Sequence, residues 1–583
     1  MSRRKLTLQE IQNIIAQWSD NDESNEEECD ENFIPPTPHG DSAECDENLP
    51  RSEDIEEESD GEIFVESTSD QSSESEDGSD DEVTEADDND IPTVHTSPNG
   101  ISWSDQPFPV RLLNRNIIRF SPGPTLTPSS EKNSFLLFFD EEMISQIHLY
   151  TNKRMTALRK KPFSYDEIHA ALGIIIRAGA DRDNLSSLNS LFDPKDSRPY
   201  YRCAMSYNRF KLFLRHATMD NKSTRRTRQA DDKMAAVRDV WNLFQRNLLK
   251  YYVPSENLTI DEQLYGYRGY IPGRSYMATK PAKYGIKIFW ICDVNGFALK
   301  GIIYTGKVDG QRQTGLTLKL VKDLSIPFHY SSRNIYMDRY FTSFEAVSHL
   351  LDHGLSAVGT VTASRRDVPV IFKAVKGREC FSSKTLYEHS KKVLLLSYVP
   401  KKNKNVLMMS SFHQKPEIHI DREDKKSQIV LDYNSGKGGV DIMDSRIEDF
   451  TTKRKTNRYT MLLLFNVIDV SVNNAFLLFS YASPTLEKKT FMKNLSAQLA
   501  YENMTRRCQN PKVFAQTKDS FYRFGLPMQI SPITNAAYTA NTARPSKCQE
   551  KGCRKSTRIK CQMCNKCICS DHGITIHACS SCH

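Results

Sequence analysis

The first 100 residues of this 583-residue sequence contain almost no basic side chains: 4 are basic and 32 acidic, a net charge of −28. The other 483 residues carry 74 basic and 42 acidic side chains, a net charge of +32. The formal net charge of +4 therefore combines an acidic tail with a basic body. Such asymmetry favours nucleic acid or a membrane surface as partner, with the tail competing for the same basic surface. A merely solubilising tail is the alternative.

Long apolar runs are also missing from the sequence. No apolar segment of the kind that directs secretion lies near the N-terminus, so secretion is not indicated. The best candidate for a membrane span, residues 461–482, contains Asn466, Asp469, Asn473 and Asn474, which are costly in hydrocarbon. We therefore expect this segment to be a buried helix, and we expect no membrane partner.

Cysteine is sparse before residue 548, since eight of the 14 cysteines fall in the last 36 residues. This clustering argues against disulfides and favours metal binding in a reducing compartment. A 36-residue module buries too little apolar surface to fold without metal. Three pairs have the short spacing of tetrahedral Zn²⁺ sites: Cys561 with Cys564, Cys569 with His572, and Cys579 with Cys582.

The alternation of these pairs along the chain predicts a cross-brace module at 548–583 with two structural Zn²⁺ ions. The first ion is assigned to Cys548, Cys553, Cys569 and His572. The second ion is assigned to Cys561, Cys564, Cys579 and Cys582, with His577 or His583 as substitutes and Cys567 left over. We expect the module to contact DNA; a protein-interaction or ubiquitin-ligase domain is the alternative.

Hydrophobic periodicity divides the rest of the chain. Residues 6–18 predict a short amphipathic helix, and the Asp/Glu/Ser-rich remainder of the tail has too little apolar surface to fold. From 101 to 257 the period is helical, with Ser164 and Glu167 as a capping box and 223–228 as a basic loop between helices. From 258 the period becomes that of strands, with a hairpin turn at Asn295-Gly296.

Acidic residues stand at the ends of elements in this second part. Asp261 and Glu262 lie at the tip of the first strand, Asp338 ends a later short strand, and Asp441 and Asp444 share one helical face. A βββαβ order with acids on its first and fourth strands is similar to an RNase H-like fold. Hard ions such as Mg²⁺ take carboxylate and phosphate oxygens, and two of them can clamp an in-line phosphoryl displacement.

The acids therefore predict a site for two Mg²⁺ ions if the fold brings them together. For a single Asp at a helix start, such as Asp441, an N-cap is the alternative. The stretch SGKGG at 435–439 lacks the Ser/Thr and the spacing of a P-loop, so nucleotide binding is not expected.

A basic segment follows directly after the last acids. Candidates for phosphate contacts are Lys453, Arg454, Lys455 and Arg458, and Tyr459 is a candidate for stacking on an exposed base. An exposed basic helix start is the alternative, but the neighbouring acids favour contact with DNA.

Seven stretches together resemble the piggyBac family of DNA transposases. They are 261–269 (DEQLYGYRG), 276–287 (YMATKPAKYGIK), 304–307 (YTGK), 338–343 (DRYFTS), 358–361 (VGTV), 432–444 (DYNSGKGGVDIMD) and 453–459 (KRKTNRY). The resemblance extends from about residue 121 to the C-terminus. It implies that Asp261, Asp338 and Asp441 are a metal-binding triad and that Asp444 is a supporting fourth carboxylate. Two departures are Arg339, where the family commonly has Asn, and Tyr459, where it commonly has Trp.

Residues and resemblance together predict a multidomain α/β protein. Its predicted parts are an acidic disordered tail (1–100), an all-α DNA-binding and dimerisation domain built from both flanks (101–257 and 451–530), an RNase H-like catalytic core (258–366 and 431–450), a β-rich insertion (367–430), a linker (531–547) and the zinc module (548–583).

The predicted function is that of a nuclear cut-and-paste DNA transposase. The resemblance implies hairpinned element ends, double-stranded DNA partners with terminal inverted repeats and TTAA targets, and a homodimer. The alternative is a domesticated DNA- or chromatin-binding protein that keeps the fold without catalysis. The presence of all four carboxylates counts against that alternative.

Overall fold

The structure is a computed structural model that describes residues 93–109, 121–271, 273–278, 280, 282–306, 315–374, 376–526, 546–550, 552–557, 567 and 569–572. The expected helix at 6–18 and the acidic tail up to 92 lie outside the described residues. So do most of the expected linker and the ligands Cys561, Cys564, Cys579 and Cys582.

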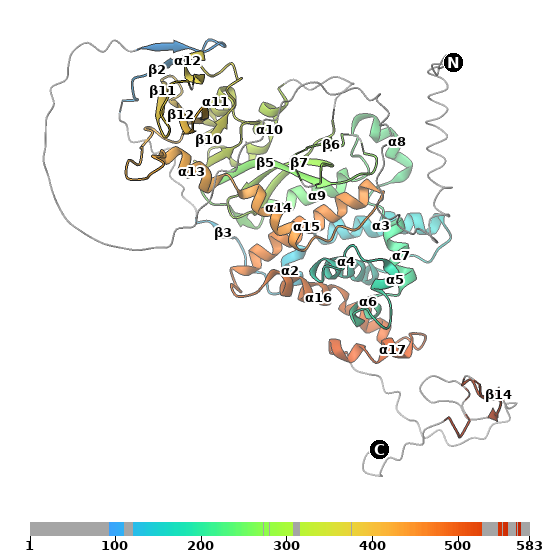
Figure 1. Cartoon of the computed structure of the whole chain (residues 1–583). Coiled ribbons are helices and arrows are strands. Elements are labelled where there is room, and N and C mark those ends of the chain that lie inside the picture. Colours follow the sequence, from blue (N-terminus) through green and yellow to red (C-terminus); the bar gives the residue numbers. More distant parts are fainter. Residues whose placement is uncertain are drawn as a thin grey trace, which may run out of the picture. The chain divides into compact units, whose positions relative to one another are not determined.

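One large mixed sheet runs through the body of the described chain (Figure 1). Its strand order is β1-β2-β11-β12-β13-β10-β9-β5-β7-β6, and β8 also pairs with β7. The strands are β1 (Val94–Thr96), β2 (Ser102–Ser104), β5 (Asn257–Gly266), β6 (Ser275–Tyr276), β7 (Tyr284–Asp293), β8 (Ala298–Ile303), β9 (Asn334–Met337), β10 (Ser356–Val361), β11 (Ser383–Glu388), β12 (Val393–Lys401) and β13 (Lys404–Ser410). The fold is therefore mixed α/β.

Five of these strands form the part that carries the acids. β5, β9 and β10 run parallel, while β7 is antiparallel to both β5 and β8. Helices cover both faces of this part, so its strands are apolar along nearly their whole length, as in IKIFWIC of β7. The turn between β7 and β8 contains Gly296, whose φ of 79° favours glycine.

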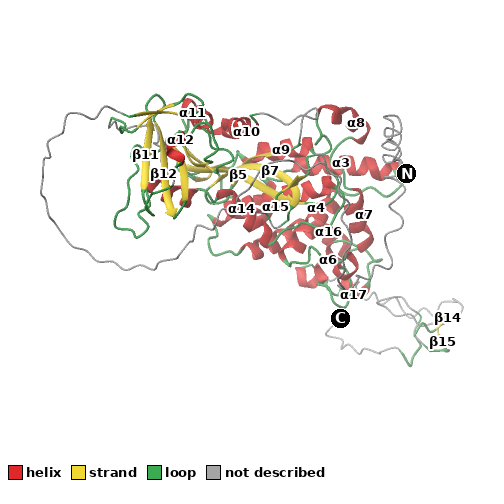
Figure 2. Ribbon diagram, turned by 45° about the horizontal axis from the view of Figure 1, so that its top comes forward, coloured by secondary structure: helices red, strands yellow, loops and turns green. Residues whose placement is uncertain are grey.

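Helices from two distant parts of the sequence pack into one bundle beside the sheet (Figure 2). The earlier ones are α2 (Glu131–Leu136), α3 (Glu141–Ala157), α4 (Tyr165–Ala180), α5 (Leu188–Leu191), α6 (Pro199–Ala204), α7 (Tyr207–His216), α8 (Lys222–Asp231) and α9 (Arg238–Leu248). The later ones are α15 (Tyr459–Ser480), α16 (Lys488–Cys508), α17 (Ala515–Lys518) and the short η3 (Phe521–Phe524). α16 packs against α4, and both α15 and α16 pack against α2.

The remaining short elements flank the sheet or stand apart from it. The helices are α10 (Leu316–Ser325), η2 (Ile326–Phe328), α11 (Phe344–Asp352), α12 (Val370–Lys373), α13 (Gln428–Gly436) and α14 (Gly439–Asp449). Two small hairpins pair β3 (Gly123–Pro124) with β4 (Tyr252–Val253) and β14 (Ser546–Lys547) with β15 (Ser556–Thr557).

α15 is the one described helix long and apolar enough to cross a membrane, and 83% of its apolar window is buried inside the fold. Three of its polar side chains have specific partners that position neighbouring elements. Asn474 pairs with the backbone of Ala298 through both its amide and its carbonyl oxygen, and Asn473 donates to the carbonyl of Gly296. Asp469 accepts hydrogen bonds from Thr451, Thr452 and Tyr265. The helix is thus a core helix whose polar residues hold the β7–β8 turn and the segment that follows α14.

Several sequence-based boundaries need correction. β1 and β2 lie in the sheet, because β2 pairs with β11 through Tyr387 and Ser104, so the folded part begins before residue 100 and the segment from 101 does not start as helix. β13 pairs with β10, so the predicted insertion at 367–430 continues the central sheet. β14 begins at Ser546, inside the predicted linker.

One expectation for the helical region also changes. α2 and α3 are separate helices, because Asp140 caps α3 by accepting a hydrogen bond from the backbone of Met143 at 3.0 Å. The expected basic loop at 223–228 lies in α8, and Arg225 and Arg228 both pair with the buried Asp220. Those two guanidinium groups are neutralised inside the protein.

The first residue of α16 gives a pH-dependent prediction. The ammonium group of Lys488 donates to the carbonyl of Arg446 at the end of α14. Burial lowers the pKa of Lys488 to about 8, although Asp469 and Asp449 oppose the shift. The folded state therefore binds fewer protons than the unfolded state between pH 8 and the ordinary lysine pKa, and stability rises with pH across that window.

We expect Lys488→Met to remove this slope. Between pH 8 and 10 the unfolding free energy of the parent chain should rise relative to the variant by on the order of 2 kcal/mol, as measured by urea denaturation. The exposed neighbour provides the control, since Lys489→Met should keep the slope. Parallel profiles for the parent and Lys488→Met would contradict the assignment.

Candidate active site and Cys/His metal centre

Asp261 and Asp338 are neighbours on adjacent parallel strands. Ile260 of β5 lies opposite Met337 of β9, and each aspartate is the next residue. Adjacent strands are separated by about 4.8 Å, so this register alone places the two backbones side by side. Asp338 follows the last residue of β9, where its side chain accepts hydrogen bonds from the backbones of Tyr340 (3.0 Å) and Phe341 (3.3 Å). The turn after β9 therefore holds this carboxylate.

The hydroxyl of Thr259 brings Asp441 to the same face of β5. It donates to the carbonyl of Gly436 at 2.7 Å and accepts from the backbone of Gly439 at 3.3 Å, so it ties the junction of α13 and α14 to the strand. Thr259 and Asp261 are two residues apart and therefore share a face. Asp441 lies in the first turn of α14, beside that face.

Glycine is required at two positions of this junction. A side chain at Gly436 would overlap the ring of Tyr336, and a Cβ at Gly439 would lie 2.7 Å from the carbonyl of Asp293. A Cβ at Gly438 would meet only Ile442, at an ordinary 3.7 Å. The glycines of SGKGG thus allow close packing of α13 and α14 on the sheet.

We expect Gly436→Ala and Gly439→Ala to destabilise the protein by about 1–3 kcal/mol each, because overpacking forces the junction away from β5. Displacing Asp441 should also lower any metal-dependent cleavage. Thermal unfolding and a nicking assay would measure both effects. Gly438→Ala is the matched control and should be nearly neutral; equal effects at all three positions would contradict the close-packing argument.

A buried amide orients Asp444. Gln263, fully buried on the same face of β5, donates to Asp444 at 2.7 Å and accepts from Trp290 and Asn466 at 3.1 Å each. Because Trp290 and Asn466 both donate to the amide oxygen of Gln263, the NH₂ group of that amide must be the end that points at Asp444. Asp444 is thereby held one helical turn from Asp441.

The acids influence one another electrostatically. Burial raises the pKa of Asp261 well above its usual range, and the charges of Asp338 and Asp441 raise it further. Burial and the charge of Glu262 raise the pKa of Asp338 to about 6. Burial also raises the pKa of Asp444, against the hydrogen bond from Gln263. A divalent cation would offset the charges of Asp338 and Asp441 that raise the pKa of Asp261.

The donor set fits hard divalent cations, since it consists of carboxylate oxygens. Asp441 is 67% exposed at its side chain, and its oxygen lies 3.9 Å from the ammonium of Lys280. Among the described residues, these carboxylates are not one of the groups whose ligand atoms all lie within 4.8 Å of one another. Such an open arrangement is compatible with two ions about 3.5–4 Å apart, each touching different ligands.

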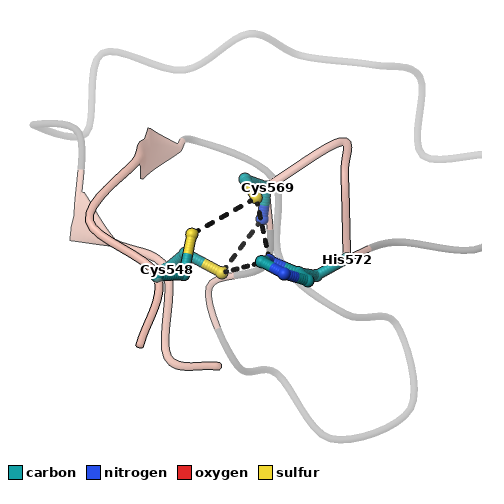
Figure 3. A group of neighbouring side chains, drawn as sticks. Cys548, Cys569 and His572 are labelled. Carbon is teal, nitrogen blue, oxygen red and sulfur yellow. Dashed lines mark hydrogen bonds between the residues drawn. The ribbon is translucent and has the colours of Figure 1, made fainter. Parts of the chain in front are cut away.

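Four Cys and His side chains converge in the C-terminal module (Figure 3). The sulfur atoms of Cys553 and Cys569 are 3.7 Å apart, and Nδ1 of His572 lies 3.3 Å from the sulfur of Cys569 and 3.7 Å from that of Cys548. The set is the one assigned to the first ion, and Cys567 is not part of it. Three thiolates and one imidazole form a complete tetrahedral Zn²⁺ donor set.

Two of the predicted DNA contacts have partners inside the protein. Arg458 donates to the carbonyls of Leu214, Arg215 and Ala217 at the end of α7, and Arg454 donates to those of Asp183 and Ser186. These two guanidinium groups join the segment after α14 to the helical bundle, and their contact with phosphates stays a prediction.

The other three candidates remain accessible to different degrees. Lys455 is exposed, and the ammonium of Lys453 lies over the ring of Tyr265, 4.8 Å from its centroid. Tyr459 is half-buried at the start of α15, where burial raises its pKa and Gln229 of α8 bonds to its hydroxyl. Its ring is thus packed against the bundle.

The chain is similar to known transposases in both sequence and structure. A family model described as transposase IS4 matches residues 130–476, and one described as the Tc5 transposase C-terminal domain matches residues 526–579. A piggyBac transposase, solved as a synaptic complex with hairpin DNA, has a TM-score of 0.69 and 32% identity, covering 80% of this chain and 100% of that one. The chain belongs to the piggyBac family of transposases.

A human relative in this family is PiggyBac transposable element-derived protein 2, which is 24% identical over 376 residues. The match spans 59% of this chain and 60% of that protein, less than two thirds of its length. The piggyBac resemblance first seen in seven short stretches is thus confirmed over most of the chain.

Several residues around the piggyBac-like acids were missed by sequence reasoning. Thr259 and Gln263 each lie two residues from Asp261, and alternate residues of a strand point to the same face of the sheet. This spacing could have identified them. Lys280 lies in a stretch that carried the resemblance, but its sequence separation from Asp441 concealed the contact. At the departure Arg339, the positive charge lowers the pKa of Asp338, opposing the effect of burial.

Proposed function

We propose that this protein is a cut-and-paste DNA transposase whose catalytic carboxylates are Asp261, Asp338 and Asp441, supported by Asp444. The observation that carries the proposal is the placement of Asp261 within β5, beside the end of β9 that Asp338 follows, and of Asp441 in the first turn of α14. The strand order β8-β7-β5-β9-β10 supports an RNase H-like catalytic core.

The chain's own residues would hold two Mg²⁺ ions and orient the reacting DNA. When bound, such ions supply Lewis acidity that stabilises the attacking and leaving oxygens of an in-line displacement at phosphorus. Thr259 and the two glycines hold α14 so that Asp441 faces Asp261, and Gln263 directs Asp444 toward the same point. In the proposed sequence of reactions, water hydrolyses one strand at the element end, and the freed 3′-hydroxyl attacks the opposite strand, displacing the flanking DNA and forming a hairpin. A second hydrolysis opens the hairpin, and the regenerated 3′-hydroxyl attacks a phosphodiester of a TTAA target, displacing the target's own 3′-oxygen.

A surface beside the acids has the chemistry of a DNA contact. The connection between β5 and β7 exposes Arg268, Tyr270, Arg274 and Tyr276, and Tyr270 is 87% exposed. Lys280 in the same connection reaches Asp441. Cations that neutralise phosphate and aromatic rings that stack on bases commonly occur together in such surfaces. With Lys453 and Lys455, these residues are proposed to hold double-stranded DNA at the site.

The C-terminal module is proposed to bind Zn²⁺ and to read the inverted repeats at the element ends. The match to a transposase C-terminal domain and the described Cys/His group support this role. The second ion would use Cys561, Cys564, Cys579 and Cys582. We also propose a homodimer, because two element ends must be joined. The proposed location is the nucleus.

The test is a strand-cleavage assay on the DNA that flanks the coding sequence, searched first for matched inverted repeats. With Mg²⁺ the protein should nick these ends, form hairpins and join the product to TTAA sites, and with a chelator it should only bind. Binding without nicking at any Mg²⁺ or Mn²⁺ concentration would overturn the proposal. That outcome would favour the second candidate, a domesticated DNA- or chromatin-binding protein; the human relative is named as a transposable element-derived protein.

A further inference from the structure

Three histidines form a cluster away from both sites described above. His329 follows η2, while His349 lies in α11 and His353 caps its end, one helical turn later. Each offers a ring nitrogen, and these three nitrogens all lie within 4.8 Å of one another. The ring centroids of His353 and its two neighbours are 4.2 Å and 4.1 Å apart. Histidines at i and i+4 on one helix face are a common arrangement for a metal ion.

The hydrogen bonds of the cluster leave lone pairs available. Nδ1 of His353 lies 2.7 Å from the carbonyl of His349, which can only accept, so this nitrogen carries the proton and Nε2 keeps its lone pair. Nε2 of His329 lies 3.3 Å from the hydroxyl of Ser325, whose own proton goes to the carbonyl of Lys322. Nδ1 of His329 is therefore the free nitrogen. Carbonyl and hydroxyl partners of this kind orient imidazole ligands in metal sites.

The third histidine of the cluster, His349, has a buried nitrogen without a partner in the described part of the chain. Nε2 of His349 is buried and makes no hydrogen bond to any described residue. A buried polar atom without a partner costs free energy, and a metal ion would satisfy it. This orphaned atom and the three-way convergence are separate observations that point to the same ligand.

The backbone holds the two halves of the cluster together. Tyr330 donates to the carbonyl of His353 at 2.7 Å, and Ser332 donates to that of Gly354 at 3.1 Å. Between these halves the chain passes through β9 and the turn of Asp338. An ion here would cross-link the two ends of the segment that carries β9 and α11.

We propose that His329, His349 and His353 bind one transition-metal ion of the Zn²⁺ class. The ligand set contains no carboxylate, and its charged neighbours are Lys300 near His329 and Lys322 and Asp352 near His349. This environment disfavours Mg²⁺ and Ca²⁺ and suits the borderline metals that imidazole binds, such as Zn²⁺, Co²⁺ and Ni²⁺. With three protein ligands, the ion would keep a fourth position for water.

The test compares full-length protein with His349→Gln, His353→Gln and the control His389→Gln, an exposed histidine outside the cluster. After dialysis against excess Zn²⁺, metal analysis should find about one ion fewer per chain in the first two variants than in the parent and the control. Zn²⁺ should raise the melting temperature of the parent more than that of the cluster variants, and Mg²⁺ should not reproduce the difference.

The absorption spectrum of bound Co²⁺ distinguishes this site from the cysteine-rich module. A nitrogen-only Co²⁺ site lacks the sulfur-to-metal charge-transfer band, so the cluster variants should lose only visible bands while the near-ultraviolet thiolate band remains. If His349→Gln does not fold, His353→Gln gives the same comparison. Equal metal content and equal Co²⁺ spectra in the parent and a folded cluster variant would overturn the proposal and leave the histidines as rings that only pack against one another.

Discussion

Asp261→Asn, Asp338→Asn and Asp441→Asn are each expected to abolish Mg²⁺-dependent strand cleavage while DNA binding persists. Asparagine keeps the shape of the side chain but withdraws the negative charge that holds a hard cation. Removing one group that stabilises transition-state charge costs about 10²–10³-fold in turnover, and loss of an ion's ligand should cost at least that much. Nicking of labelled element-end DNA, with a parallel binding titration, measures the two properties separately.

The same experiment has internal controls. Asp449→Asn changes an exposed acid at the far end of α14 and should leave cleavage unchanged. Asp444→Asn should have a comparable or smaller effect than the triad variants, because Gln263 holds that side chain as a support. A triad variant that nicks DNA at the parent rate would remove that residue from the site.

The double substitution Cys548→Ser with Cys569→Ser is expected to unfold the C-terminal module and eliminate specific binding to element ends. It removes two of the four side chains of the Cys/His group, and both are labelled in Figure 3. The free energy of Zn²⁺ binding in such modules, about 10–16 kcal/mol, is also their folding free energy. The central sheet and helical bundle have their own buried core, so circular dichroism of the chain should change little.

Zinc content and end binding measure this prediction. Metal analysis should show loss of the ion held by the mutated ligands, and chelator treatment of the parent should reproduce the loss of end binding. Cys567→Ser is the matched control, because Cys567 lies in the same module but outside the converging group. Retained zinc and parent-like end binding in the double variant would refute both the ligands and the DNA-reading role.

The sequence was most informative where chemistry depends on residue type and short spacing. Charge composition separated the acidic tail from the basic body, and the seven stretches indicated the piggyBac family. The polar residues at 466, 469, 473 and 474 correctly predicted a buried core helix, because each buried polar group needs a partner that hydrocarbon cannot supply. Local spacing also indicated that Asp441 and Asp444 share one helical face.

Tertiary structure decided which distant residues meet. Gln263 and Asp444 are 181 positions apart, and only the packing of α14 on β5 brings them within hydrogen-bond distance. Arg454 and Arg458 are of a residue type that commonly contacts DNA, yet in the fold they donate to the backbone carbonyls of Ser186 and Arg215. No short sequence motif contains all three histidines, because β9 and most of α11 separate His329 from His349 and His353 along the chain. Periodicity and composition describe each segment by itself, whereas these contacts depend on strand register and helix docking, which the whole chain sets together.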